Sequence, residues 1–99
     1  MEFVNTELHL SLLYHKAKES FEQCIQNDAN QFLKDELSMP FDDIVLIEKD
    51  IKIVFSKRVF EEYNIEVCLL LYAGNNEVGR YLYIENDKNQ AIDDSLVLY

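Results

Sequence analysis

The chain has 99 residues, of which 48% are hydrophobic, and it contains two glycines and one proline. A chain of this length and composition is too short for two domains and too apolar for disorder, so we expect a single domain over residues 1–99. Nineteen acids against nine bases give a formal net charge of -10. This charge argues against binding to nucleic acid or to an anionic membrane, because both need positive charge on the protein. It favours a basic partner, although an acidic surface also serves solubility alone.

The N-terminal part of the chain has the spacing of an amphipathic helix. From Glu7 to about Asn27, apolar residues recur at intervals of three and four: Leu10, Leu13, Tyr14, Ala17, Phe21, Cys24 and Ile25. Asn5 or Thr6 is suited to cap this helix. The apolar phase continues over residues 29–37, which predicts a second short helix that ends at Pro40. We therefore expect residues 1–40 to be helical.

Beyond Pro40, short runs rich in β-branched and aromatic residues predict strands over residues 43–48, 51–56, 65–73, 78–85 and 95–99. Turn signals lie at residues 49–50, 74–76 and 87–89, and such short connections favour a meander. Residues 57–63 suit either a helical turn or a continuing strand. The predicted fold is of the α+β class, with an N-terminal helix or helix pair packed on one face of a four- to five-stranded antiparallel sheet over residues 41–99.

Alternation along the predicted strands assigns side chains to two faces of the sheet. One or two helices can cover only one of these faces. The other face is expected to carry Cys68, Leu70, Tyr72, Tyr81 and Tyr83. Tyr is common at binding surfaces because it combines apolar area with a hydrogen-bonding tip, although tyrosines also occur on sheet faces that bind nothing.

The sequence lacks the motifs of catalysis and of metal binding. His9 and His15 lie six residues apart, which separates them around a helix, and neither a nucleophile elbow nor a glycine-rich phosphate loop is present. Neighbouring acids such as Asp93 and Asp94 point to opposite faces of a strand and do not converge on one site. We therefore expect no enzymatic activity, no metal and no cofactor.

Two further features concern cysteines and basic residues. Cys24 and Cys68 have neither the spacing of metal ligands nor that of a disulfide framework, so both are expected as reduced core residues. The bases concentrate locally at Lys49, Lys52, Lys57 and Arg58. Acids at positions 42, 43, 48 and 50 balance them, which predicts local salt bridges rather than a phosphate-binding patch. No signal-length or membrane-length apolar run occurs, so a cytoplasmic location is expected.

The end of the chain resembles a known kind of hairpin. The sequence Glu77-Val78-Gly79-Arg80-Tyr81-Leu82-Tyr83-Ile84-Glu85 precedes a polar turn and then Ile92-Asp93-Asp94-Ser95-Leu96-Val97-Leu98. This pattern resembles the C-terminal hairpin of small immunity proteins from bacterial polymorphic-toxin and contact-dependent growth inhibition systems. It covers roughly the last quarter of the chain, and the turn at residues 87–90 lacks the glycine often found there. The resemblance implies an antitoxin role, in which the chain binds and neutralises a cognate toxin, commonly a basic nuclease, in the cytoplasm.

The candidate partner-binding residues lie in this hairpin and beside it: Tyr72, Tyr81, Tyr83, Glu85, Asp87, Asp93 and Asp94. Residues 59–99 carry eight acids and two bases, so a basic toxin domain is the expected partner, bound by a monomer or a weak homodimer. Two other classes stay open: a DNA-mimicking or phage-type inhibitor, and an acidic secretion chaperone. The neighbouring gene would discriminate between them, since each class has a different companion.

Overall fold

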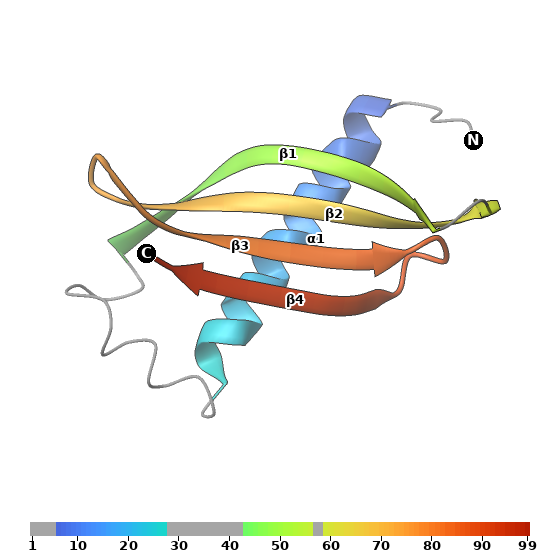
Figure 1. Ribbon diagram of the computed structural model, residues 1–99. Helices are drawn as coiled ribbons and strands as arrows, with labels where there is room; N and C mark the ends of the chain where they lie inside the picture. Colours follow the sequence, from blue (N-terminus) through green and yellow to red (C-terminus); the bar gives the residue numbers. More distant parts are fainter. Residues whose placement is uncertain (1–5, 28–42, 57–58) are drawn as a thin grey trace.

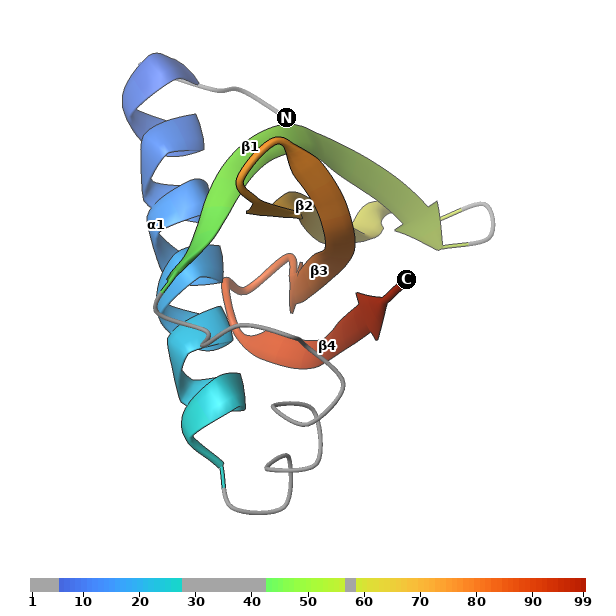
Figure 2. The same cartoon turned by 90° about the vertical axis from the view of Figure 1, so that its left-hand side faces the viewer.

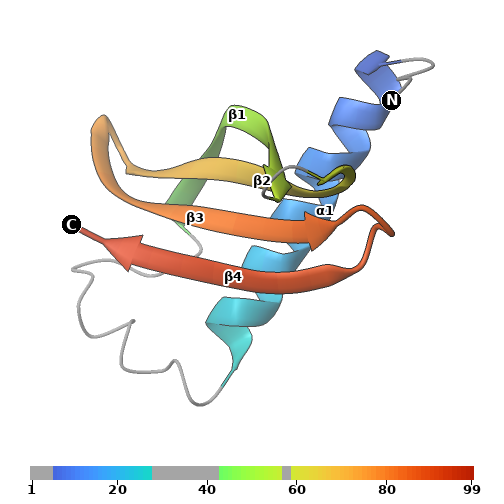
Figure 3. The ribbon, with the colours of Figure 1, turned by 45° about the vertical axis from the view of Figure 1, so that its right-hand side comes forward.

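The computed structural model describes residues 6–27, 43–56 and 59–99, which form one helix and one sheet. Helix α1 (Thr6–Gln26) is followed by four strands: β1 (Ile44–Ser56), β2 (Val59–Ala73), β3 (Asn76–Asn86) and β4 (Ala91–Leu98). The strands lie in the order β1-β2-β3-β4, and each neighbouring pair is antiparallel (Figures 1 and 3). The predicted α+β fold, with an N-terminal helix on an antiparallel meander, is confirmed.

The helix packs on the sheet through the predicted apolar stripe. Leu13, Ala17, Phe21 and Ile25 recur every four residues and are all buried, at most 8% exposed. They meet the buried side chains of β2 and β3 and so form the core of the molecule. Helix α1 crosses one face of the sheet only (Figures 1 and 2). The second helix predicted over residues 29–37, with its end at Pro40, lies outside the described residues.

Strand β1 differs from the expectation of two short strands joined by a turn. It runs unbroken for 13 residues, and the polar pair at 49–50 lies inside it. The register of β1 against β2 shifts between Glu48 and Asp50, so Lys49 is the extra residue of a β-bulge. A polar dipeptide between apolar runs predicts a turn, but here the runs on both sides pair with the same strand and the bulge absorbs the interruption. Strand β2 starts at Val59, so the alternative left open for residues 57–63 is decided in favour of a strand over 59–63, and residues 57 and 58 lie outside the described residues.

Two tight connections link β2 to β3 and β3 to β4, as the turn signals predicted. Gly74 has φ 62° in the first, a conformation that suits glycine. In the second, the Asn86 side-chain oxygen accepts hydrogen bonds from the backbone N–H groups of Lys88 (2.9 Å) and Gln90 (3.0 Å). Asn89 takes up the positive φ of 62°, which asparagine tolerates. Strand β4 consequently starts at Ala91, earlier than predicted.

The register between β2 and β3 decides which side chains face the helix. Tyr81 lies opposite Leu69 and Tyr83 lies opposite Val67. Directly opposed residues share a face, so the two tyrosines lie with the core, where they are 0% and 5% exposed. The expectation that they share an uncovered face with Cys68, Leu70 and Tyr72 is therefore wrong. Alternation defines two faces within each strand, but only the register decides which faces of neighbouring strands coincide.

Candidate functional site

Tyr81 lies at the centre of the contact between helix and sheet. Its hydroxyl donates to Asp94 Oδ2 at 2.7 Å and lies 2.5 Å from Ser20 Oγ of α1, and its ring packs edge-on against Phe21. Burial raises the pKa of Tyr81 well above its usual value, and the hydrogen bond to Asp94 raises it further. The residue joins α1, β3 and β4 and is not available to a partner while the helix is in place.

Tyr83 and Glu85 form a second polar contact beneath the helix. Glu85 is fully buried, and its Oε2 accepts a hydrogen bond from the Tyr83 hydroxyl at 2.9 Å and lies 3.4 Å from Lys16 Nζ. Burial, followed by this hydrogen bond, raises the pKa of Tyr83 to about 12. Tyr81, Tyr83 and Glu85 were expected at the partner interface. Their burial corrects that expectation, because they hold the helix on the sheet.

The other predicted site residues divide between two faces and a turn. Tyr72 is half-buried on the face away from the helix, and Asp93 lies on the same face because it is opposite Ile84. Asp94 is opposite Tyr83 and belongs to the helix side. Asp87 lies in the turn between β3 and β4, beside a shallow hollow. The seven residues therefore do not form one surface, and only Tyr72 and Asp93 share an accessible face.

We call the sheet face turned away from α1 the open face. By register it consists of Val45, Ile47, Asp50, Lys52, Val54, Glu66, Cys68, Leu70, Tyr72, Arg80, Leu82, Ile84, Asp93, Ser95 and Val97. Within residues 6–27, 43–56 and 59–99, no helix or strand packs over it (Figure 2). Apolar side chains on it are consequently accessible: Val45 is 54% exposed, Val54 43% and Ile47 42%.

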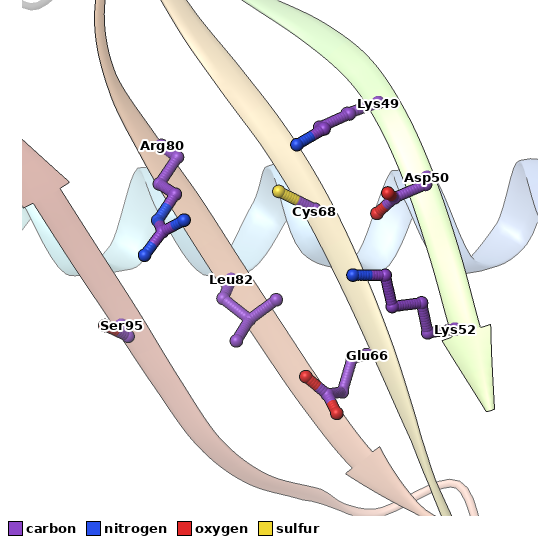
Figure 4. Close-up of a pocket in the computed structure, with 8 residues that line it drawn as sticks. All are labelled: Lys49, Asp50, Lys52, Glu66, Cys68, Arg80, Leu82 and Ser95. Atoms are coloured by element: carbon purple, nitrogen blue, oxygen red, sulfur yellow. The ribbon is translucent and has the colours of Figure 1, made fainter. Parts of the chain in front are cut away.

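A hollow of about 230 Å³ lies in the middle of the open face (Figure 4). Three cations line it, Lys49 and Lys52 from β1 and Arg80 from β3, together with the acids Asp50 and Glu66. Cys68 and Leu82 provide an apolar floor. Burial raises the pKa of the Cys68 thiol and Asp50 adds to this, whereas Lys49, Arg80 and Lys52 act in the opposite direction. The thiol therefore stays protonated at neutral pH and is a poor nucleophile.

The sequence did not indicate this hollow. The predicted salt bridges around Lys49 and Lys52 are not formed with the described residues, because Glu48 points to the helix side and pairs with Lys18 at 2.6 Å. Lys57 and Arg58 lie outside the described residues. Alternation along β3 places Arg80 with Leu82, which is a usable signal. Nothing in the sequence marks the bulge that brings Lys49 to the same hollow.

The described residues show neither a metal-binding cluster nor a membrane-spanning helix. Among the described residues, no group of three or more His, Cys, Asp or Glu side chains is placed to hold a metal ion. His15 pairs with Glu19 at 2.8 Å on the exposed side of α1. Cys24 and Cys68 are both thiols. No helix in the described part of the chain is both long and apolar enough to cross a membrane.

Comparisons with protein-family models, with curated proteins and with solved structures found no match to this chain.

Proposed function

We propose that this protein is a non-catalytic immunity protein that neutralises a cognate toxin domain by stoichiometric binding through the open face of its sheet. One observation carries the proposal: a helix covers one side of the sheet, and the other side presents accessible apolar side chains. Val45, Ile47 and Val54 are each more than 40% exposed on a single strand. Exposed apolar side chains gathered on one sheet face of a small protein, with charged residues among them, are typical of a surface that another protein covers.

Of the three tyrosines predicted to contact a partner, Tyr72 is the one that is not buried beneath the helix. It lies between Val45 and Glu77 across the three neighbouring strands, and it is half-buried. A tyrosine among aliphatic side chains and acids has the composition of an interface hot spot. An interface of standard size buries about 1,200 to 2,000 Å² in total.

The toxin class of the partner rests on the C-terminal hairpin and on charge. Gly79, Tyr81 and Tyr83, which carry the resemblance to immunity proteins, have structural roles in this hairpin. The resemblance therefore supports a shared hairpin architecture more than a shared set of contact residues. The net charge of -10 favours a basic partner, and Asp93 brings negative charge to the open face.

The proposal is tested with the product of the adjacent gene. Cells expressing that product should stop growing and should recover when this chain is co-expressed. An Ile47→Asp/Tyr72→Ala variant should abolish the recovery, whereas Leu12→Asp, at a 49% exposed position on the helix, should preserve it. Circular dichroism confirms that both variants fold. An adjacent product without toxicity, or rescue unaffected by the open-face variant, would contradict the proposal.

A further inference from the structure

We infer that the hollow on the open face is an oxyanion-binding site, which takes a carboxylate or phosphate group between Lys49 and Arg80. The two cations approach from β1 and β3 on either side of Cys68 in β2 (Figure 4). The inference concerns a ligand site, and it holds whether or not the proposed toxin is the partner.

The bulge in β1 creates one side of the site. In a regular strand Lys49 and Asp50 would point to opposite faces. Because the register shifts between Glu48 and Asp50, Lys49 has no paired residue on β2 and lines the same hollow as Asp50. Bulges commonly re-aim a side chain near a functional site. The additional residue therefore adds a cation to a face that alternation would have left without it.

Arg80 supplies the other side and has no acid beside it across the sheet. Its cross-strand neighbours are Leu70 on β2 and Val97 on β4. The closest acid along its own strand is Glu77, three residues away. Neither Arg80 nor Lys49 forms an ion pair with any residue that the structure describes. Their donors are thus open to a ligand.

Positive and negative side chains are unevenly distributed within the hollow. Lys52 lies opposite Glu66, and Asp50 follows Lys49 directly on β1. The two acids therefore leave one of the three positive charges of the hollow unmatched, and Arg80 is the cation with no acid opposite it. Three of the six Lys and Arg side chains described in this acidic chain line the one hollow. Such a local reversal of sign is unexpected from composition alone.

The chemistry of the lining selects an oxyanion. A guanidinium presents a planar fork that matches carboxylate and phosphate oxygens, and an ammonium beside it adds a point charge. The apolar floor of Cys68 and Leu82 reduces competition from water and strengthens these contacts. A volume of about 230 Å³ holds the anionic group together with part of the molecule that carries it.

The test is an NMR titration of the ¹⁵N-labelled full chain at constant ionic strength maintained with sodium chloride. One arm uses inorganic phosphate, and the other uses a blocked Gly-Glu-Gly peptide, which presents a single carboxylate. Saturable shifts at the amides of Lys49, Cys68 and Arg80 are expected in at least one arm, and the arm that binds more tightly identifies the source of the anion. Absence of saturable shifts in both arms would overturn the inference.

Two variants make the test specific. Lys49→Ala/Arg80→Ala should weaken the tighter ligand by about tenfold or more, and Lys88→Ala, in the exposed β3–β4 turn, should leave its affinity unchanged. Arg80→Lys should give an intermediate loss, because charge is kept and the fork is removed. Both cations are exposed, so the fold should survive, as the dispersion of the amide spectrum will verify. Equal affinities of the double variant and the parent chain would refute the assignment.

Discussion

At the scale of single residues, the tyrosine hydroxyls of β3 hold the helix against the sheet. Tyr81 connects Ser20 of α1 with Asp94 of β4. From the sequence alone, such a tyrosine cannot be distinguished from one that binds a partner, because the sequence does not show whether the side chain is exposed or buried. The difference lies in the partner of the hydroxyl, which only the folded chain reveals. Tyr72, on the open face, has no hydrogen-bond partner among the described residues.

Replacing Tyr81 by Phe should therefore lower the free energy of unfolding by about 1 to 3 kcal/mol, because Asp94 and Ser20 lose a shared partner. Tyr72→Phe provides the matched control and should change the stability by less than about 0.5 kcal/mol. Urea denaturation followed by circular dichroism measures both. Equal effects of the two substitutions would show that the hydrogen bonds of the Tyr81 hydroxyl do not stabilise the fold.

The raised pKa of Tyr83 predicts how the stability of the chain depends on pH. Its pKa is raised from an ordinary value of 10.0 to about 12 in the folded chain. Between these values the folded chain retains a proton that the unfolded chain has released, so stability must fall as the pH rises. Urea midpoints measured from neutral pH to about pH 12 should decline across this window. A Tyr83→Phe variant should be less stable at neutral pH but should show a shallower alkaline decline, and parallel curves would contradict the assignment.

At the scale of elements, much of the fold could be predicted and the pairing of faces could not. Helix α1 was predicted from a stripe with a period of 3.6, and the turns at Gly74 and Asp87 were predicted from their residue types. The prediction misplaced Tyr81 and Tyr83 because a shift of one residue in register exchanges the two faces of a strand. It missed the hollow for a related reason, since a bulge at Lys49 changes the alternation locally. Of the candidate site, Tyr72 and Asp93 lie on the accessible face. The concentration of bases at Lys49 and Lys52 was recognised but assigned to local salt bridges, and Arg80 was not associated with it.

The close pairing of β3 with β4 depends on Gly79. A Cβ atom built at this position would lie 2.5 Å from the carbonyl oxygen of Val97 and 3.3 Å from the Leu98 Cα. Backbone atoms cannot move aside without disturbing the ladder, so Gly79→Ala should destabilise the chain by about 1 to 3 kcal/mol. Gly74→Asn is the control, because its surroundings are open and asparagine tolerates positive φ. Thermal unfolding compares the two, and an unchanged midpoint for Gly79→Ala would contradict the crowding argument.

At the scale of the whole molecule, two electrostatic patterns act over different ranges. On the proposed function, the net charge of -10 should attract the basic partner during its approach. The cations of the hollow act only at contact, because they are few and lie among acids in a chain of net negative charge. A basic protein that offers one carboxylate to the hollow satisfies both patterns. In the proposal, the negative charge that attracts the partner is therefore distinct from the cations that contact it in the complex.

On the proposed function, the location of negative charge on the open face should govern how fast the toxin binds. Asp93→Lys and Glu22→Lys change the net charge equally, yet Asp93 lies on the open face and Glu22 is exposed on α1. Stopped-flow measurements at low salt should show the larger loss of association rate for Asp93→Lys, with little change in the dissociation rate. Asp94 is unsuitable for this test because it accepts the Tyr81 hydrogen bond, so its reversal would disturb the fold. Equal slowing by both substitutions would mean that only total charge matters and that the partner does not dock on the open face.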